Sequence, residues 1–514
     1  MSRPDYIVVG SGSAGSVLAR RLLDAEAGSV LVLEAGGSHD DNPAVHDPTA
    51  WPSLWGTEVD WAYRTVPQVH TADRVHDWPR GRVLGGTSCL NAMQYIRGHR
   101  ADFDAWAAAG NTGWGHDDVL PVFMGLEDHH EGASALHGAG GPMHVSILRD
   151  RDANPTSTAF VEACVEVGYL RNDDINGATT EGAGWNPTSI RDGVRQDTWT
   201  TFLAPVVGRP GLEVRTGARV ARLLVERGRV TGVELDDGER LHAEREVVLC
   251  AGAIDSPRLL LQSGIGPADE LRAVGVDPVH DLPGVGRNLH DHLLLGVVYE
   301  ATEPLPAGRN NLSESVLFTT STRGTPAPDI QVALVHVPFH SPEFTAPANS
   351  YTIAPGIVAP QSRGSVRLLD AGPGGALAID PNYLGEEADV EGLLEGIAMS
   401  REIGEAHAFD RWRRREVLPG PDVTSSAALC DFVARAASTY YHPAGTCAMG
   451  TGDDAVVDPE LRLHGLDGLR VADASVMPTM VSVNPNATIT MIGAKAAALI
   501  SGVAASSGQR LAAR

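Results

Sequence analysis

The strongest constraint on the fold is a glycine pattern near the start of the chain. Gly10, Gly12 and Gly15 have the spacing G-x-G-x-x-G, after the apolar residues 6–9 and before residues 16–23, which have helical periodicity. In such a strand, turn and helix, the first glycine allows a tight turn, the second lets the backbone approach a pyrophosphate, and the third packs the helix against the strand. The helix N-terminus adds free N–H groups and partial positive charge. The pattern therefore predicts a dinucleotide-binding site.

A second apolar run, residues 29–33, ends in an acidic residue, Glu34. A carboxylate about 20 residues after the glycines hydrogen-bonds a ribose hydroxyl in units of this kind. Glu34 fits the free 2′-hydroxyl of NAD or the adenosine ribose of FAD, and it disfavours a 2′-phosphate. These elements predict an α/β fold class, with a Rossmann-like dinucleotide-binding domain.

Length and charge limit the domain count and the partners. A chain of 514 residues is too long for one compact core, so we expect two domains. The net charge of -25 argues against a nucleic-acid partner, because a polyanion is repelled by an acidic surface. The small and basic residues after Ser501 predict a frayed tail.

The cysteines predict neither a disulfide framework nor a zinc site, because they are widely spaced and contain no C-x-x-C pair. They are Cys89, Cys164, Cys250, Cys430 and Cys447. We expect no metal, and a reducing cytoplasm fits this pattern. The first strand begins almost at Met1, and no apolar run is long enough to span a bilayer, so neither a signal peptide nor an integral membrane segment is expected. The sequence thus predicts a soluble cytoplasmic protein.

Hydrophobic patterns place further elements along the chain. We expect a β-hairpin from residues 212–226 and 230–235, and a buried strand over 246–253 followed by a helix that begins at Ser256 and Pro257. Residues 143–195 are polar and turn-rich. The block from 299 to 439 is typical of a second domain, with strands at 330–337 and 365–369 and an amphipathic helix at 390–403; a last helix is expected at 488–500.

Five longer motifs carry a family resemblance. Residues 81–104 and 252–266 resemble the two signatures of the glucose-methanol-choline (GMC) oxidoreductases, which are FAD enzymes. The other similar motifs are residues 283–292, 441–446, and 471–478 together with 483–486. The motifs occur in order along nearly the whole chain.

The resemblance implies a discontinuous two-domain organisation. The FAD-binding domain is expected from residues 1–142, 196–298 and 440–514. The substrate-binding domain, an insert of antiparallel sheet and helices, is expected from residues 143–195 and 299–439.

The resemblance also implies a set of FAD contacts. Those at the adenosine end are Gly10, Gly12, Ser13, Ala14, Gly15, Glu34 and Ala35, with Val220 holding the adenine through its backbone. Further contacts are expected from Arg82, Leu84, Gly86 and Ala251. Beside the isoalloxazine and ribityl groups the implied residues are Asn91, Ala92, Met93, Gln94, Asp473, Ala474, Asn484, Pro485 and Asn486.

The implied chemistry is oxidation of an alcohol, which needs a base for the hydroxyl proton while a hydride passes from carbon to flavin N5. Histidine is the usual base, because its pKa is close to working pH. His442 lies in the position of the family's catalytic histidine, and Asn484 matches its hydrogen-bonding partner. Asn484 would orient the substrate oxygen through its amide.

Differences from the choline-oxidising members indicate how the cofactor is bound and which class of substrate is favoured. Leu90 replaces a histidine that is covalently bonded to flavin in some members, so we expect non-covalent FAD. Leu294 replaces the carboxylate that neutralises the trimethylammonium group, although Glu314 would restore a cation site if it faced the pocket. The other expected pocket residues are Trp51 and Tyr441, which resemble two walls of an aromatic cage, with His336 and Tyr440. A neutral primary alcohol, aliphatic or aromatic, is therefore favoured over choline.

The electron acceptor stays open, and there are three alternative functions. The acceptor is O₂, a quinone or a dye; bulky Tyr440, two residues before the base, and the sequence of residues 446–450 slightly favour a dehydrogenase. The main alternative is a hydroxynitrile lyase with redox-silent FAD. A photodecarboxylase would use no pair of the His442 and Asn484 type, and a non-enzymatic flavoprotein would not have its flavin bleached by substrate. The oligomeric state is not predicted.

Overall fold

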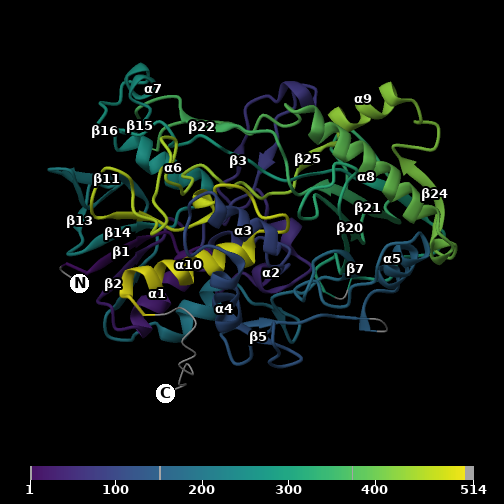
Figure 1. Ribbon diagram of the computed structural model, residues 1–514, viewed down its shortest axis with the longest axis horizontal. Helices are drawn as coiled ribbons and strands as arrows, with labels where there is room; N and C mark the ends of the chain where they lie inside the picture. Colours follow the sequence, from purple (N-terminus) through teal and green to yellow (C-terminus); the bar gives the residue numbers. More distant parts are fainter. Residues whose placement is uncertain (1–2, 150–151, 309, 373, 504–514) are drawn as a thin grey trace.

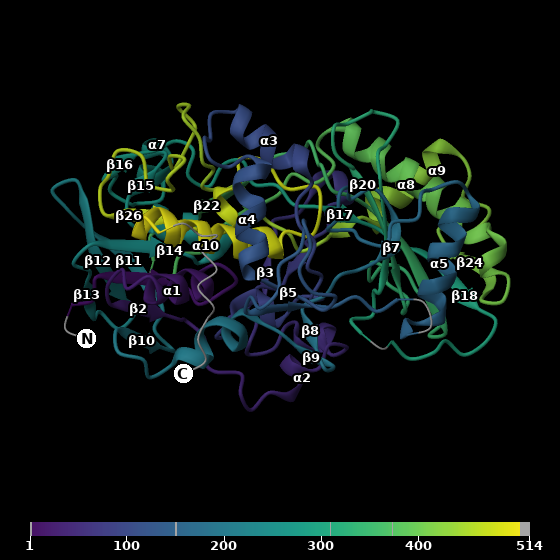
Figure 2. The same ribbon diagram turned by 60° about the horizontal axis from the view of Figure 1, so that its bottom comes forward.

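The computed structural model describes residues 3–149, 152–308, 310–372 and 374–503, and it shows an elongated molecule with two lobes (Figures 1 and 2). Most of the tail expected to fray after Ser501 lies outside the described residues. The first lobe contains both ends of the described chain, and the second contains much of its middle.

A parallel sheet forms the centre of the first lobe. Its strand order among the described residues is β10 (Leu212–Arg215), β2 (Val30–Leu33), β1 (Tyr6–Val9), β14 (Glu246–Leu249) and β26 (Leu469–Val471). All four adjacent pairs are parallel, with Val8 opposite Val32 on one side and Val248 on the other. Strands β1, β2 and β14 are fully buried apart from Glu246, as expected for a sheet covered on both faces.

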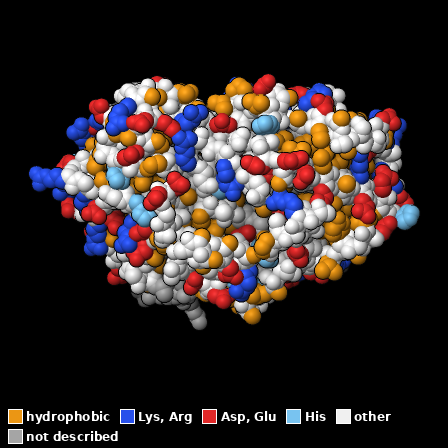
Figure 3. All heavy atoms as spheres, turned by 45° about the horizontal axis from the view of Figure 1, so that its top comes forward, with side chains coloured by type: hydrophobic (Ala, Val, Ile, Leu, Met, Phe, Trp, Pro, Cys, Tyr) orange, Lys and Arg blue, Asp and Glu red, His pale blue; other side chains and the backbone are white. Residues whose placement is uncertain are grey.

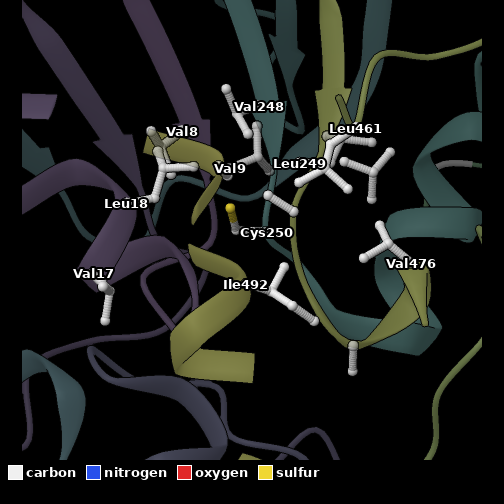
Figure 4. Packing of buried hydrophobic residues seen from close by; sticks show 14 of the residues in the cluster. Val8, Val9, Val17, Leu18, Val248, Leu249, Cys250, Leu461, Val476 and Ile492 are labelled. Atoms are coloured by element: carbon white, nitrogen blue, oxygen red, sulfur yellow. The ribbon is translucent and has the colours of Figure 1, made fainter. Parts of the chain in front are cut away.

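Helices cover this sheet and bring the end of the chain back to its beginning. Helix α1 (Gly15–Asp24) packs against α10 (Asn486–Ser501), and α6 (Gly252–Gln262) follows β14. Figure 4 shows Val8 and Leu18 from the first strand and helix close to Leu249 and to Ile492 of α10. The first strand–turn–helix unit and the last helix, predicted at 488–500, are confirmed.

Two predicted boundaries in this lobe are wrong. Leu212–Arg215 is not part of a hairpin: it is the parallel edge strand β10, and the antiparallel pair is β11 (Val220–Glu226) with β12 (Arg229–Leu235), extended by β13 (Arg240–His242). The helix after β14 begins at Gly252, not at Ser256, because Asp473 accepts a hydrogen bond from the Gly252 backbone N–H at 2.8 Å and stabilises the earlier start.

The second lobe contains a sheet of long and short strands, and its strand pairs within the described residues are antiparallel. Its order among the described residues is β24 (Arg413–Leu418), β18 (Val297–Ala301), β21 (Ser350–Ile357), β20 (Ile330–Val335), β19 (Ser315–Thr319) and β7 (Gly182–Trp185). The short strands β17 (Leu293–Leu294) and β25 (Ser438–Thr439) pair with each other, and β17 also pairs with β21. The antiparallel sheet expected for the second domain is present.

Three helices pack in this lobe: α5 (Pro155–Glu166), α8 (Glu387–Glu405) and α9 (Ser426–Ala436). Helix α8 begins three residues before the expected range 390–403 and ends two residues after it, and it packs against β21. Helix α5 was not expected, because its polar N-terminal half resembles a turn region; Asn154 caps it by accepting from the Thr156 N–H at 3.0 Å.

Shorter elements connect and cover the two sheets. The remaining helices are α2 (Pro43–His46), α3 (Arg100–Ala108), α4 (His116–Leu126) and α7 (Ala268–Ala273). The remaining strand pairs are β3 (Tyr63–Arg64) with β4 (Asp77–Trp78), β5 (Glu127–His129) with β6 (Met143–Val145), β8 (Ile190–Arg191) with β9 (Val194–Arg195), β15 (Ile265–Gly266) with β16 (His280–Asp281), and β22 (Ser365–Leu368) with β23 (Leu377–Asp380).

The chain passes between the lobes close to two of the expected domain boundaries. β17 precedes residue 298 and β18 contains it, and β25 ends just before residue 440. The assignment of segments to domains stays a prediction.

The surface carries the acidic charge in dispersed form. On the face shown in Figure 3, acidic and basic side chains alternate over both lobes. Within the described residues, no helix combines the length and the apolar character needed to cross a bilayer.

Candidate active site

A single long cavity connects the glycine turn with the edge of the antiparallel sheet. At one end it is lined by Gly10, Gly12, Glu34 and Val220 of the first lobe. At the other end it is lined by Leu294, Val335 and Phe339, together with Tyr440 to Pro443. The cavity therefore brings together the predicted dinucleotide site and residues from the second lobe.

The glycine turn has the geometry that a dinucleotide needs. Gly10 has a φ of 98°, which favours glycine, and a Cβ on Gly15 would lie 2.0 Å from the Gly10 carbonyl oxygen. A Cβ on Gly86 would lie 2.7 Å from the Cα of Gly12, so the two loops touch through bare backbone. Ser13 donates to Asn486 at 2.7 Å, which joins the start of α1 to the start of α10.

Glu34 is held in place by the turn that it faces. Its carboxylate accepts hydrogen bonds from the Ser11 hydroxyl at 2.6 Å, the Ser11 N–H at 3.1 Å and the Gly36 N–H at 2.9 Å. Burial raises the pKa of Glu34, and these hydrogen bonds oppose the rise. The side chain lines the cavity in a fixed orientation, as a ribose-binding carboxylate requires.

Most of the predicted cofactor residues do line the cavity. They are Gly10, Gly12, Ser13, Ala14, Glu34, Ala35, Gly86, Asn91, Ala92, Met93, Gln94, Val220, Ala251, Asp473, Ala474, Asn484, Pro485 and Asn486. Gly15 lies beneath the turn instead, where it packs against the Gly10 backbone.

Two predicted cofactor residues, Arg82 and Leu84, do not line it. The Arg82 side chain is exposed, and its guanidinium lies 5.3 Å from the ring centre of Trp61. Leu84 is buried in the hydrophobic core of the first lobe. Val83 and Gly85, the other residues between Gly81 and Gly86, do not line the cavity either, so the chain turns away from it over this short stretch.

The turn at residues 91–93 is fixed by buried hydrogen bonds. Asn91 Oδ1 accepts from the Met93 N–H at 3.0 Å and from Arg195 at 2.9 Å, and Met93 has a φ of 56°. Asn311 donates to the Ala92 carbonyl oxygen at 2.5 Å. The turn presents its backbone to the cavity from a rigid support.

His442 lies at the point where the two lobes meet. Its Nε2 is 3.4 Å from the amide nitrogen of Asn484, and its Nδ1 is 3.0 Å from Nδ1 of His292. The ring of Tyr440 stacks on it, with centroids 4.7 Å apart and an interplanar angle of 22°. The predicted pair of His442 and Asn484 is thus brought together.

The surroundings of His442 keep it neutral. Burial lowers the pKa of His442 well below its usual value, and the charges of His292 and Arg80 lower it further. Burial also lowers the pKa of His292, to about 3, and the backbone at Val358 and Val481 opposes that shift. A neutral imidazole next to Asn484 can accept a proton from a hydroxyl group in the cavity.

Asn484 receives its orientation from the antiparallel sheet. Gln331, in β20, donates through Nε2 to Asn484 Oδ1 at 3.1 Å, and both side chains are buried. The Asn484 amide nitrogen therefore faces His442.

The backbone around His442 is anchored by one buried carboxylate, Asp291. It accepts from the His442 N–H at 2.6 Å, from the Thr439 hydroxyl at 2.5 Å and from the Tyr383 hydroxyl at 2.5 Å. The Tyr441 N–H donates to the Thr439 hydroxyl at 2.7 Å. This network holds Tyr441 at a φ of 65°, an uncommon conformation for a non-glycine residue that turns His442 toward the cavity.

Aromatic side chains form one wall of the cavity near His442. The rings of Trp51 and Trp55 have centroids 5.1 Å apart, and those of Trp55 and Tyr441 are 4.7 Å apart. Leu294, Val335 and Phe339 contribute an apolar wall. Trp51 and Tyr441 lie in the pocket as expected, and so does Tyr440.

Glu314 and His336 were expected in the pocket, and the structure places both behind its wall. Glu314 accepts from the Asn154 N–H at 2.6 Å at the start of α5, and His336 Nε2 is 2.8 Å from the hydroxyl of Ser157 in the same helix. Their chain neighbours Ser313 and Val335 line the cavity instead, because adjacent side chains of an extended chain point to opposite sides.

Several residues of the site were not predicted: Trp55 and Trp61 line the cavity, whereas His292 and Gln331 lie behind its lining and contact His442 and Asn484. Trp55 and Trp61 belong to a tryptophan-rich segment whose composition was visible in the sequence, but no spacing rule connects that segment to the cavity. His292 ends a family motif, and its position beside an Asp in that motif was a usable signal. Gln331 carries no local signal, because its role depends on strand pairing across the sheet.

One buried group has the residue types of a metal site: His39, Cys89 and Asp197. His39 Nε2 lies 3.5 Å from Asp197 Oδ1. Burial lowers the pKa of His39, but the hydrogen bond and charge of Asp197 outweigh this effect and raise the pKa above its usual value. An ion pair accounts for this contact, and the expected absence of a metal stays a prediction. The five cysteines, all within the described residues, are free.

The shape and chemistry of the cavity fit FAD. A bare glycine cradle, a fixed carboxylate at the end of the second strand and a polar backbone turn at residues 91–93 follow one another along it. Asp473, which follows β26, accepts hydrogen bonds from the Gly252 N–H at the start of α6 and from the hydroxyls of Ser256 and Ser475, so its side chain is fixed in the cavity wall.

Comparisons with known proteins agree with this arrangement. Models of the GMC oxidoreductase family match residues 4–294 and 360–493. The mitochondrial choline dehydrogenase of Mus musculus is 39% identical, over 97% of this chain and 89% of that protein. The pyridoxine 4-oxidase of Microbacterium luteolum is 40% identical, over 94% of this chain and 96% of that protein. A crystal structure of pyridoxine 4-oxidase from Mesorbium loti has a TM-score of 0.92 at 43% identity, covering 96% of this chain and 98% of that one.

Proposed function

Because this chain belongs to the GMC oxidoreductase family, an FAD-dependent family that acts on alcohols, we propose that it oxidises a neutral primary alcohol to the aldehyde, with His442 as the base. The observation that carries the proposal is a neutral, buried His442 paired with Asn484 beside the aromatic and apolar part of the cavity wall. FAD supplies the hydride acceptor when bound.

The protein's own groups would position and deprotonate the alcohol. Asn484 Nδ2 donates toward the substrate oxygen, and His442 Nε2 accepts the hydroxyl proton. Tyr440, stacked on the His442 ring, restricts that ring to one orientation and keeps water from it.

A neutral substrate is favoured over choline by the charge of the pocket. Leu294 lines the cavity where a carboxylate would be needed, and Glu314 faces α5 rather than the pocket. The aromatic wall of Trp51, Trp55 and Tyr441 alone offers a cation less stabilisation than an aromatic wall with a carboxylate. The same wall suits an apolar or planar alcohol.

We propose that the FAD is bound without a covalent bond to the chain. Leu90, which lines the cavity before the turn at residues 91–93, offers no nucleophile to the flavin ring. Denaturation of the yellow protein in acid should release all of its flavin into the supernatant. Colour retained in the precipitate would contradict this proposal.

For the electron acceptor, we propose a quinone or dye rather than O₂. Tyr440 fills the space beside His442 on the side where a small apolar residue would leave room for O₂. We further propose a cytoplasmic location and the discontinuous domain boundaries given above, on the sequence features that predicted them. We propose no nucleic-acid partner.

The proposed activity is tested with the purified yellow protein mixed anaerobically with choline, benzyl alcohol and an aliphatic primary alcohol. We expect the neutral alcohols to bleach the flavin and choline to fail, followed by slow recovery of colour in air and rapid recovery with a quinone. Bleaching by choline alone would contradict the neutral-substrate proposal.

A matched variant sharpens the test of substrate charge. In Leu294→Glu, choline should bleach the flavin, and the rate of flavin reduction by benzyl alcohol should fall. In Leu294→Met, the response to both alcohols should be that of the wild type. If no alcohol bleaches the flavin but a cyanohydrin is cleaved, the lyase alternative replaces our proposal; no observation here favours that alternative.

A further inference from the structure

The buried ring of His292 has no role in the function proposed above, although it lies against the base. It is 0% exposed, it does not line the cavity, and its only hydrogen bond to a described side chain joins its Nδ1 to Nδ1 of His442 at 3.0 Å. One of these two nitrogens must carry the proton and the other must accept it. The direction of that hydrogen bond decides where His442 keeps its lone pair.

We propose that His292 is a positioning residue that selects the tautomer of His442 needed for proton abstraction. In this tautomer His442 carries its proton on Nδ1 and donates it to His292, so that Nε2 presents a lone pair to the cavity. This inference rests on the proposed role of His442 as the base.

The contacts of His292 on its other side set the direction. In a histidine, a backbone group raises the pKa by accepting from a ring N–H, and the backbone of Val358 and Val481 acts in this way on His292. His292 Nε2 is buried and has no hydrogen bond of good geometry in the described chain. Because Nδ1 of His292 faces His442, we assign this ring N–H to Nε2, which leaves Nδ1 as the acceptor for His442.

The contacts of Asn484 require the same direction. Gln331 Nε2 donates to Asn484 Oδ1 at 3.1 Å, so the amide nitrogen of Asn484 is the atom that faces His442 Nε2 at 3.4 Å. A proton on His442 Nε2 would place two donors against each other. The four side chains of Gln331, Asn484, His442 and His292 form a row of hydrogen-bonded groups. The contacts at both ends of this row require the same arrangement of protons.

The charged and titratable groups around the pair leave this arrangement intact. Burial and the charge of Arg80 lower the pKa of His442, and burial lowers the pKa of His292 to about 3, so both rings are neutral. The Asp291 carboxylate accepts hydrogen bonds from the His442 N–H and from the hydroxyls of Thr439 and Tyr383. Tyr440 stacks on the His442 ring without a hydrogen bond to its nitrogens in the described chain. His290, two residues before His292, makes no side-chain hydrogen bond within the described residues.

The arrangement affects the rate as well as the orientation. When His442 takes the hydroxyl proton it becomes a cation, and its Nδ1–H then donates a charge-assisted hydrogen bond to His292. Such a bond is worth more than its neutral counterpart, so it stabilises the protonated base as proton transfer proceeds. The proton moves from the alcohol oxygen to His442 Nε2, and His292 keeps its own proton throughout.

The test compares His292→Leu, His292→Asn and the control His290→Leu, which removes a second buried histidine of the same segment. At saturating benzyl alcohol, His292→Leu should lower the rate constant of flavin reduction by about 10-fold to 100-fold, the loss expected for one charge-assisted hydrogen bond. Its solvent deuterium isotope effect should rise, because proton abstraction becomes harder. His292→Asn, whose Oδ1 can accept from His442 Nδ1, should recover most of the rate, and His290→Leu should retain it.

A purely structural role predicts a different pattern. Loss of bound FAD in proportion to activity, with an unchanged rate and isotope effect per bound flavin, would overturn the proposal. An equal effect of His290→Leu would overturn it as well.

A measurement on the resting wild-type holoenzyme separates this inference from the proposed function and does not require a folded His292→Leu variant. Imidazole ¹⁵N spectra, assigned with His442→Asn and His292→Asn, should show a proton on His442 Nδ1 and a bare Nε2. A proton on Nε2 would overturn the inference even if alcohols bleach the flavin. Failure of every alcohol with the expected tautomer present would overturn the proposed function alone.

Discussion

The chain contains two buried groups of histidines with opposite protonation behaviour. In the cavity, His442 and His292 face each other with Arg80 nearby, and burial lowers the pKa of both rings. Between α4 and the second lobe, His137 lies between two carboxylates, with Nδ1 3.2 Å from Glu127 and Nε2 3.0 Å from Asp174. Burial opposes its ionisation, but hydrogen bonds to Asp174 and Glu127 raise the pKa of His137 to about 9.

The comparison shows that burial alone does not decide what a histidine does. The ring of His129 stacks on His137 at 4.0 Å, yet burial and the charge of His137 lower the pKa of His129 to about 4. A buried histidine with carboxylate neighbours, such as His137, is a cation at neutral pH and joins segments of the chain. One with neutral or cationic neighbours stays neutral and can accept a proton. Four predictions test this difference.

The largest effect is expected from removal of the base. His442→Ala should lower the rate of flavin reduction by about 10²-fold to 10⁴-fold, the usual contribution of a positioned base, with FAD content retained. Anaerobic stopped-flow absorbance with a neutral alcohol measures this. His137→Asn is the matched control and should reduce its bound flavin at the wild-type rate; an equal loss in both variants would remove the distinction between the two groups.

The second effect is on stability and depends on pH. The pKa of His137 is raised above its unfolded value, so its stabilisation is complete below about pH 6.5 and is lost as pH rises through about 9. His137→Asn should therefore lower the free energy of unfolding by up to about 3 kcal/mol at pH 6, and by less at pH 9.5. Urea unfolding at both pH values measures the difference.

The control for this experiment is an exposed histidine with a similar partner. His407 Nδ1 lies 3.1 Å from Asp410, but the His407 side chain is 89% exposed. His407→Asn should change the unfolding midpoint little at either pH, because solvent screens the pair. If the loss in His137→Asn is the same at pH 6 and pH 9.5, His137 is not the cation described here.

A smaller effect is expected from the neutral hydrogen bond that orients Asn484. Gln331→Leu should lower the rate of flavin reduction by about fivefold, since an uncharged hydrogen bond contributes about 1 kcal/mol. Gln331→Glu should lower the rate of flavin reduction at least as much, because a buried carboxylate would not donate to Asn484 Oδ1. Retention of the full rate in both variants would show that Asn484 is oriented by other contacts.

The smallest effect is expected from pH in the wild type. Because the pKa of His442 lies well below 6.5, its imidazole is already neutral at neutral pH. The enzyme should lose activity only when the pH approaches this lowered pKa. Between pH 6.5 and 8.5 the limiting rate of flavin reduction should change by less than about twofold. A steep rise across that range would show that His442 titrates near neutrality and is not desolvated as the structure indicates.

Local signals explain which parts of the site were predictable. The turn with Gly10, Gly12 and Gly15, the carboxylate of Glu34 and the pair of His442 and Asn484 all lie in motifs that sequence spacing or family resemblance identifies. Glu314 and His336 were misplaced because the register of an extended segment decides which of two neighbours faces a cavity. Helix α5 was missed because its cap, Asn154, and its partner Glu314 are far apart in the chain.

The sequence by itself determined the glycine turn and the α/β class of the first lobe, and it pointed to His442 as the proposed base, because each depends on residues within a few positions of one another. Only the tertiary structure decided which ring nitrogen of His442 faces the cavity, where Glu314 points, and that His292 and Gln331 support the base. These depend on contacts between residues more than a hundred positions apart, and burial with its desolvation exists only after the lobes have packed together.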